Sequence, residues 1–461
     1  MSVHAPRGGE RGRHEPASRL AQRRALRLYT LAWWLLAPLA VLRLLWRSRR
    51  DAAYRACLGE RFGHYRAAAP ARGDAPMLWL HAVSLGETRA AAPLLESLRR
   101  EIPELRLLLT HTTPTGRGAG AELLRDGDAQ VWLPYDLPWA VRRFLEHFQP
   151  PVGVLMETEL WPNLARACAD RGIQLLLANA RLSARSAARW ARWPALAHAT
   201  CGALAGAAAQ TGGDASRLRG LGVRDVVVAG NLKFDRRADA ALRAQGQRWR
   251  AAAARRVLVL ASTREDRGAS EEQLLLDAMP GGLARRALVV LVPRHLERVA
   301  ALQVMLDQRG LRHGLRSRGE PDSGLDVWIG DSIGEMPAYY AMSDAAFVGG
   351  SLLPLGGQNL IEACAEGCPV VMGPHVFNFA QAVEQGEQAG AVARAQDAAG
   401  VWTRLLGWLD DAPALQRARA AARDFSSAHR GAARAQAHWI AQRLRDAATR
   451  REPGAGSARD Q

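Results

Sequence analysis

The chain has 461 residues, of which 48% are hydrophobic and 23% are charged. This composition excludes a disordered chain, which has too few apolar residues to fold, and a collagen-like chain, which has far more glycine. The length predicts two domains, or three, with enough residues for a sizeable core. The five cysteines are odd in number and scattered, unlike the disulfide framework of a small secreted protein, which indicates a reducing compartment.

The positive charge is concentrated at the N-terminus. The formal net charge is +17, and residues 1–50 hold 11 arginines against two glutamates. A nucleic-acid-binding protein more often spreads its basic groups over a folded face. A basic cluster beside apolar residues is typical of a segment that meets an anionic lipid surface. We therefore expect a membrane as a partner and no nucleic acid.

The apolar residues of this region form one stretch. Residues 28–42 (LYTLAWWLLAPLAVL) contain no charge, and arginines lie on both sides of them. A full span needs about 20 apolar residues, so this stretch can span a bilayer or lie in it. Bulky residues follow where a signal peptide would have its small-residue cleavage site. We predict a basic N-terminus and membrane anchor in residues 1–50. The alternative is a buried amphipathic helix of the first domain.

Short apolar runs alternate with helical stretches from Met77 onward. Continuous apolar runs are typical of parallel strands in a sheet that is covered on both faces. The first series predicts strands at 77–83, 105–110, 129–134, 152–157, 173–179 and 226–230; the second predicts strands at 256–262, 287–293, 326–331, 345–350 and 369–374. The expected fold is α/β, with two Rossmann-like domains facing a cleft. The expected boundaries are 51–235 for the first domain, 236–255 for a linker, 256–450 for the second domain and 451–461 for a disordered tail.

Two strand-to-helix turns of the first domain carry carboxylates. Open α/β sheets bind ligands at the carboxyl ends of their strands. Glu87 follows the first strand in HAVSLGE (81–87), where it can act as a general base or cap the helix that begins there. Glu157 and Glu159 follow the fourth strand in METELWPN (156–163). We expect no more than one of this pair to be a helix cap.

Lys233 is the only lysine in a chain that has 61 arginines. It lies in GNLKFD (230–235), directly after an apolar strand. A compact ammonium differs from a planar guanidinium in hydration and geometry. The exception therefore predicts a functional role for Lys233. The alternative is a surface lysine that has remained by chance.

The second domain has polar and glycine-rich turns at the ends of its strands. They are PRH (293–295), GDSIGE (330–335), GGS (349–351) and GGQNLIE (356–362), where a cation, backbone amides or a helix N-terminus can meet an anion. The sequence has no P-loop motif, so it does not favour a P-loop ATPase. Asp126 and Asp128 predict a polar turn rather than a metal site. Cys364 and Cys368 predict small buried side chains rather than a zinc site.

These segments together resemble a known family. The segments are HAVSLGE, TPTG (113–116), METELWPN, ANARLSARS (178–186), GNLKFD, PRH and residues 330–379. They resemble those of the Kdo transferases, which move 3-deoxy-D-manno-octulosonic acid (Kdo) from CMP-Kdo to lipid A precursors in Gram-negative bacteria. The resemblance implies a GT-B fold with an acceptor-binding domain followed by a nucleotide-binding domain. It also implies an N-terminal anchor in the inner membrane, catalytic domains on the cytoplasmic side, and no metal or other cofactor.

The resemblance implies roles for individual residues. Glu87 matches the general base of the family, and Glu157 and Lys233 match residues that stabilise the transition state. The donor-binding segments fall on Pro293, Arg294, Ile333, Gly334, Glu335, Asn359, Leu360, Ile361 and Glu362. Three positions depart from the usual residues of the family: Arg264 and Gln358 each replace a histidine, and Ile333 replaces a methionine.

The implied reaction is a single displacement. Glu87 takes the proton of a glucosamine hydroxyl of the acceptor, the oxygen attacks the anomeric carbon of Kdo, and CMP leaves, so this carbon is inverted. Lys233 and Arg294 stabilise the departing CMP in place of a divalent ion. Two alternatives remain open: a related GT-B enzyme with a UDP-sugar donor, and a basic nucleic-acid-binding or membrane scaffold without enzyme activity.

Overall fold

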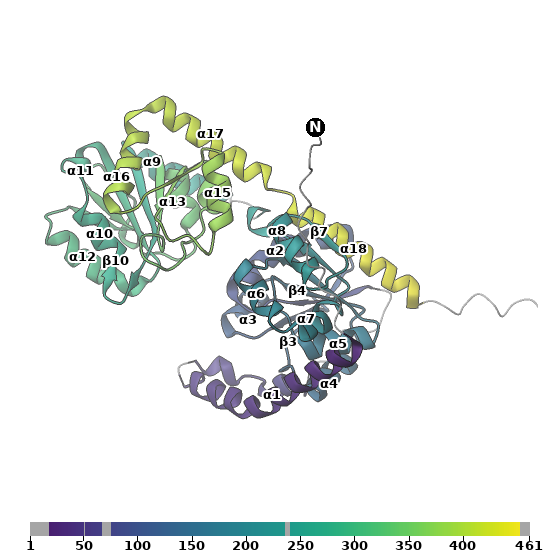
Figure 1. Cartoon of the computed structure of the whole chain (residues 1–461). Helices are drawn as coiled ribbons and strands as arrows, with labels where there is room; N and C mark the ends of the chain where they lie inside the picture. The colour runs from purple at the N-terminus through teal and green to yellow at the C-terminus, as the bar shows by residue number, and fades with distance from the viewer. Residues whose placement is uncertain (1–17, 50, 67–74, 236–239, 452–461) are drawn as a thin grey trace, which may run out of the picture. The chain divides into compact units, whose positions relative to one another are not determined.

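The computed structural model of the chain describes residues 18–49, 51–66, 75–235 and 240–451 (Figure 1). The described residues form two compact units. The first unit contains those up to Leu232 and those from Gly431 onward, and the second unit runs from Lys233 to Arg430. Of the predicted tail 451–461, Arg451 ends the last helix of the chain, and residues 452–461 lie outside the described residues, as do the basic residues 1–17.

The first unit contains a sheet of seven parallel strands in the order β3-β2-β1-β4-β5-β6-β7. Its strands are β1 (Met77–His81), β2 (Arg106–His111), β3 (Ala129–Trp132), β4 (Val152–Met156), β5 (Gln174–Ala180), β6 (Gly206–Ala209) and β7 (Val226–Val228). Successive side chains of a strand point to opposite faces. Leu78 and Leu80 accordingly pack on one side of the sheet and Trp79 on the other. Both faces are buried, which explains the continuous apolar runs.

Helices cover both faces of this sheet. They are α2 (Leu85–Glu101), α3 (Pro114–Ala121), α4 (Pro138–Phe148), α5 (Pro162–Asp170), α6 (Ala184–Ala191), α7 (Pro194–Cys201) and α8 (Gly212–Gly220). The last helix of the chain, α18 (Ala432–Arg451), also contacts α2, β4 and β5 (Figure 1). The predicted second domain, 256–450, is therefore too long at its C-terminal end. Ile440 and Leu444 of α18 are buried in the core of the first unit.

The N-terminal helix α1 (Arg19–Arg47) belongs to the first unit and contacts α5, α7 and the short helix η1 (Ala52–Arg55) (Figure 1). It is not buried as the alternative from the sequence required, since Leu28, Leu35 and Leu42 are 67%, 72% and 62% exposed. Among the described residues, it is the one helix that is long and apolar enough to cross a membrane, a weak indication by itself.

The second unit contains another sheet of seven parallel strands, in the order β12-β13-β11-β8-β14-β15-β16. These strands are β8 (Arg256–Thr263), β11 (Ala287–Pro293), β12 (His313–Leu315), β13 (Val327–Ile329), β14 (Ala345–Val348), β15 (Val370–Met372) and β16 (Val392–Arg394); β9 (Glu265–Asp266) and β10 (Ala269–Ser270) form a small antiparallel pair. The flanking helices are α9 (Ala240–Ala253), α10 (Glu271–Asp277), α11 (Leu283–Arg286), α12 (Val299–Asp307), α13 (Met336–Met342), α14 (Ile361–Ala365), α15 (Ala380–Gln388), α16 (Ala398–Asp410) and α17 (Ala412–Ala428). The predicted linker 236–255 therefore includes α9, whose Trp249 packs into the core of this unit.

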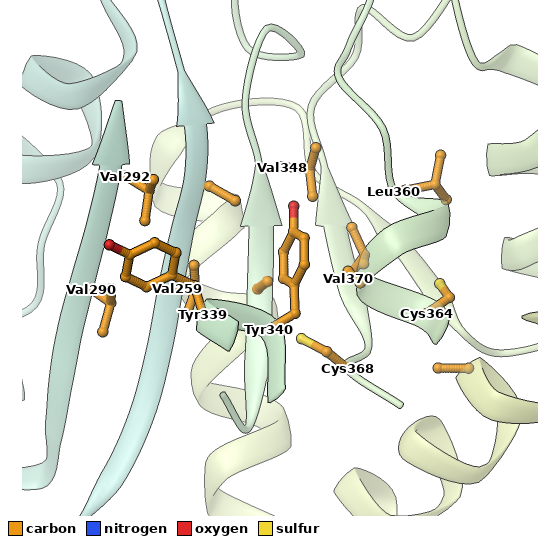
Figure 2. Packing of buried hydrophobic residues seen from close by; sticks show 14 of the residues in the cluster. Val259, Val290, Val292, Tyr339, Tyr340, Val348, Leu360, Cys364, Cys368 and Val370 are labelled. Carbon is orange, nitrogen blue, oxygen red and sulfur yellow. The ribbon is translucent and has the colours of Figure 1, made fainter. Parts of the chain in front are cut away.

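One face of the second sheet packs against tyrosines of α13, Cys364 of α14 and Cys368 of the loop before β15 (Figure 2). Tyr339 and Tyr340 lie beside the β-strand valines, and Cys364 and Cys368 complete the same cluster. Both cysteines are buried and free, and burial raises the pKa of Cys368 to about 12. The interpretation of the two cysteines as small core side chains agrees with this packing.

Candidate functional site

Glu87 lies in the first turn of α2, directly beyond the carboxyl end of β1. Ser84 caps this helix by accepting a hydrogen bond from the Glu87 amide, at 3.4 Å. The Glu87 carboxylate accepts hydrogen bonds from the Val83 amide at 2.6 Å and from the Ser84 hydroxyl at 3.2 Å. The N-cap of α2 is therefore Ser84 rather than Glu87, and the bond from the Val83 amide to Glu87 makes the arrangement close to a capping box.

The capping geometry does not remove the capacity of Glu87 to act as a base. Burial raises the pKa of Glu87 to about 7, against the lowering effect of the Val83 amide, and the negative charges of Glu157 and Glu159 raise it further. A carboxyl group with a pKa near the working pH is suited to general acid–base catalysis. His81 in the same segment is fully buried, and burial lowers its pKa to about 3, so it stays neutral.

The turn between β4 and α5 has an unusual backbone. Glu157 has a φ of +58°, a left-handed conformation that costs energy for any residue with a side chain. Its amide donates to the carbonyl of Ala178 at 2.8 Å, and the Thr158 hydroxyl donates to the carbonyl of Arg181. Strained residues that neighbouring bonds hold in place are concentrated at functional sites.

The structure brings Glu87, Glu157 and Glu159 together. Both glutamates of the β4–α5 turn act electrostatically on Glu87, and burial and then the charge of Glu157 raise the pKa of Glu159. The sequence pointed to Glu159 only as a neighbour of Glu157 and assigned no role to it. Among the residues that the structure describes, no group of three or more His, Cys, Asp or Glu side chains is placed to hold a metal ion. The arrangement can instead accept a proton.

Lys233 begins the second unit, in the short helix η3 (Leu232–Asp235). Its Nζ lies 5.6 Å from the centre of the Phe379 ring, a cation–π contact. The preceding residue is held in the first unit, where the Leu232 amide donates to Asn179 Oδ1 at 3.0 Å. Gln436 of α18 accepts from the Asn179 amide at 2.8 Å and donates to the Gly230 carbonyl at 3.1 Å.

The predicted donor-binding residues all lie at the carboxyl ends of strands of the second sheet. Pro293 ends β11, and the Arg294 amide donates to the Thr263 carbonyl at 3.0 Å.

Ile333 is 81% exposed, Gly334 has a φ of +89°, and Glu335 precedes α13. Asn359 Oδ1 accepts from the Ile361 amide at 3.1 Å at the start of α14. Leu360 and Ile361 are buried, while Glu362 is partly exposed.

Glu335 is tied to its surroundings by polar contacts. Gln245 and Arg316 donate to its Oε1 at 2.5 and 3.0 Å. Burial acts to raise the pKa of Glu335, but hydrogen bonds from Ser332, Gln245 and Arg316 outweigh it and lower the pKa. Glu335 is therefore a carboxylate at neutral pH.

Glu271 holds the predicted turn at 349–351, and the sequence analysis gave it no role. It is fully buried at the start of α10, where its carboxylate accepts hydrogen bonds from backbone amides. These amides belong to Arg264, Gly350, Ser351, Leu352 and Leu353, at 2.9, 2.7, 3.0, 2.9 and 3.4 Å. Glu271 thereby joins the loop after β8 to the glycine-rich loop after β14, which contains the predicted turn at 349–351. The adjacent glutamates 271 and 272 before an apolar helix were the available signal.

The glycine-rich loop needs glycine where two backbones meet. A Cβ on Gly349 would lie 2.6 Å from the Ser262 carbonyl oxygen and 2.7 Å from Thr263 Cα. Arg264 and Gln358, two of the departures from the usual family residues, lie next to Gly350 in this loop, since both side chains come within 3.6 Å of the position of a Cβ there. Both can donate hydrogen bonds.

The predicted turn at 126–128 is confirmed as structural. Asp128 accepts from the amides of Leu107 and Arg125 at 2.7 and 2.8 Å and pairs with Arg99 at 2.5 Å. These bonds occupy the carboxylate of Asp128. The interpretation of this segment as a turn rather than a metal site agrees with the contacts.

Comparisons with known proteins identify the family. Residues 56–236 match the family model described as 3-deoxy-D-manno-octulosonic-acid transferase (kdotransferase). The 3-deoxy-D-manno-octulosonic acid transferase of Bordetella pertussis is 45% identical over 425 residues, which cover 88% of this chain and 96% of the relative. The enzyme of the same name from Haemophilus influenzae is 36% identical over 341 residues, covering 72% and 78% of the two chains.

Solved structures support the fold. A glycosyltransferase from Rickettsia africae is similar with a TM-score of 0.55 at 10% identity, covering 81% of this chain and 99% of the other. The UDP-GlcNAc 2-epimerase from Neisseria meningitidis is similar with a TM-score of 0.52 at 14% identity, covering 80% and 100%. These likenesses and the two parallel sheets confirm the expected GT-B fold. The chain belongs to the 3-deoxy-D-manno-octulosonic acid transferase family and is a glycosyltransferase.

Proposed function

We propose that the enzyme transfers Kdo from CMP-Kdo to a lipid A precursor, lipid IVA, by a metal-independent displacement that inverts the anomeric carbon. The observation that carries the proposal is the cluster of three glutamates in this member of the family. Glu87 has a pKa of about 7 and lies with Glu157 and Glu159 at the carboxyl ends of β1 and β4. This is the edge of a parallel sheet at which substrates bind.

The chemistry follows from the charges. Ionised Glu87 accepts the proton of the acceptor hydroxyl as its oxygen forms a bond to the anomeric carbon of Kdo. The bond from this carbon to the phosphate oxygen breaks, and CMP leaves with the electron pair. Glu157 places a negative charge where positive charge develops on the sugar. Lys233 and Arg294 supply fixed positive charge for the leaving phosphate, which takes the part that a divalent ion plays in other transferases.

The second unit provides the donor site of this proposal. Pro293 and Arg294 lie at the end of β11, Glu335 follows the neighbouring strand β13, and the segment 359–362 follows β14 of the same sheet. Exposed Ile333 offers its backbone to the nucleotide where the family usually has methionine. Buried Glu271 keeps the glycine-rich loop after β14 in one conformation through its hydrogen bonds to the Gly350 and Leu352 amides.

The membrane part of the proposal rests on α1. One side of this helix packs on the first unit, and the opposite side exposes leucines at residues 28, 31, 35, 39 and 42. Arginines lie near both ends. A helix that is packed on a folded domain cannot at the same time be surrounded by lipid. We therefore place α1 in the plane of the inner membrane, with anionic lipid at its arginines and the catalytic units on the cytoplasmic side.

The test is a transfer assay with purified full-length protein. CMP-Kdo and UDP-GlcNAc are offered as donors with detergent-dispersed lipid IVA, with and without EDTA, and products are identified by mass spectrometry. We expect Kdo addition from CMP-Kdo alone and no loss in EDTA. Sugar transfer from UDP-GlcNAc would establish the UDP-sugar alternative. Inactivity in EDTA that Mg²⁺ restores would refute metal independence.

A further inference from the structure

The helix α1 is joined to the first unit by polar side chains, beyond what a membrane anchor needs. The Tyr29 hydroxyl donates to Asp136 Oδ2 at 3.0 Å and accepts from Trp33 Nε1 at 2.6 Å. One turn of helix before Trp33, the Thr30 hydroxyl lies 2.9 Å from Asn163 Oδ1 and 2.9 Å from the Leu26 carbonyl oxygen, and its one proton is shared between these two acceptors. The bonds to Asp136 and Asn163 link residues more than 100 positions apart in sequence. A tether needs none of them.

Asp136 is the centre of this network. It is 1% exposed and lies between β3 and α4. Its Oδ2 accepts from the Asn163 amide at 3.0 Å, its Oδ1 accepts from the Leu164 amide at 2.8 Å, and its carbonyl accepts from Asn163 Nδ2 at 2.7 Å. These are the amides that the first turn of a helix leaves without a partner inside the helix. Within the described residues, the N-cap Trp161 makes no side-chain capping bond to this turn, so Asp136 serves as the cap of α5.

The start of α5 is one end of the acidic turn. The other end is held to β5 and the segment after it by Glu157 and Thr158. Residues 157–161 therefore run between two fixed points, with strained Glu157 at the first and Asp136 holding the second. Because a left-handed glutamate persists only where its surroundings hold it, loosening the second point lets Glu157 and Glu159 move relative to Glu87.

We infer that Tyr29 and Thr30 of α1 are positioning residues for the transfer reaction, holding Glu157 and Glu159 in place through Asp136 and Asn163. The inference rests on the proposed function for its kinetic part. It makes α1 a component of the acceptor-side site, so this helix is not an anchor that can be separated from catalysis. A catalytic group displaced by about 1 Å can lose 10²-fold in rate.

The kinetic test uses full-length protein in detergent, so that membrane attachment does not limit turnover. Tyr29→Phe and Thr30→Val remove the two hydroxyls with little change in shape. We expect the double variant to lose at least ~10-fold in kcat with the KM for CMP-Kdo unchanged and vesicle binding unchanged. The single variant Thr30→Ser, with Tyr29 unchanged, has a hydroxyl at position 30 and should keep wild-type kcat. Tyr54→Phe, in η1 outside the network, is the matched control.

A second measurement does not depend on activity. Hydrogen–deuterium exchange of the peptide that covers residues 157–164 should become at least ~10-fold faster in the double variant, and not in Tyr54→Phe, because Asp136, which accepts from the Asn163 and Leu164 amides, loses the hydroxyl that holds it. If the wild-type protein transfers no Kdo but the double variant exchanges faster, the proposed function is rejected and the structural role of Tyr29 and Thr30 is kept. The inference would be overturned if the double variant showed wild-type exchange and wild-type kcat. If the double variant does not fold, the same result in the single variant Tyr29→Phe would overturn it.

Discussion

Replacing Glu87 with Gln separates its two roles, because glutamine keeps a carbonyl acceptor for the Val83 amide but cannot take a proton. The pKa of Glu87 is about 7 in the folded protein against 4.5 as its ordinary value. The folded state therefore binds this proton more tightly than the unfolded chain. The free energy that the tighter proton binding of Glu87 contributes to folding is fully present below pH 4.5 and is lost as the pH rises through 7.

The size of this effect follows from the shift. A difference of about 2.5 pKa units corresponds to ~3.4 kcal/mol, and this is an upper bound because the partly exposed carboxyl is screened by water. We expect about 1–2 kcal/mol in practice. Above pH 8, Glu87→Gln is free of this penalty and should be more stable than the wild type by that amount, or roughly 2–6 °C in Tm. At pH 4.5 the difference should disappear.

The assay combines thermal unfolding at pH 4.5 and pH 8.5 with transfer kinetics. Loss of a general base costs about 10²–10⁴ in kcat, so we expect an inactive variant that is more stable at high pH. For the wild type, kcat/KM should rise as the pH passes through about 7, where Glu87 ionises. Glu96→Gln, an exposed change on the same helix α2, is the control and should alter neither quantity. Wild-type turnover in Glu87→Gln, or lower stability at pH 8.5, would refute the assignment of Glu87 as a base.

Three further substitutions test other parts of the site. Lys233→Arg keeps the charge but changes its shape, and we expect at least a ~10-fold loss in kcat, about 1.4 kcal/mol of barrier; full activity in a steady-state assay would show that charge alone is needed. Glu157→Gly should be about 1 kcal/mol more stable than Glu157→Gln in urea denaturation, since glycine adopts a φ of +58° freely, while both variants lose activity; the opposite order of stability would contradict the strain. Glu271→Gln places an amide against backbone donors and should cost about 3 kcal/mol and weaken CMP binding measured by calorimetry; unchanged CMP affinity would exclude a role in donor binding.

Much of the fold was predictable because it is written in local patterns. The apolar runs of both sheets are buried on two faces, so each strand appears in the sequence as a short continuous stretch. The exceptions have a physical reason. β6 consists of one glycine and three alanines, and β12 (HGL) and β16 (VAR) have one large apolar residue each, so none of them carries enough apolar bulk to stand out.

The candidate site was predictable in part for a similar reason. Glu87 and Glu157 follow strands directly, and residues in that position meet at one edge of a parallel sheet. The resemblance of the motifs to one family then implied their roles. That Glu87 also binds the Val83 amide ahead of α2, and that Glu157 is left-handed, depends on backbone geometry that composition and spacing do not reveal.

Contacts between distant residues were decided by the tertiary structure alone. The sequence by itself determined two parallel-sheet domains, an apolar N-terminal helix and acidic turns at the carboxyl ends of strands. It contained no local sign that α18 returns to the first unit, where Gln436 binds Asn179 across 257 positions, or that Tyr29 reaches Asp136 across 107. A buried polar group must find a partner wherever the packed chain brings one. Such pairs appear only once the chain has folded.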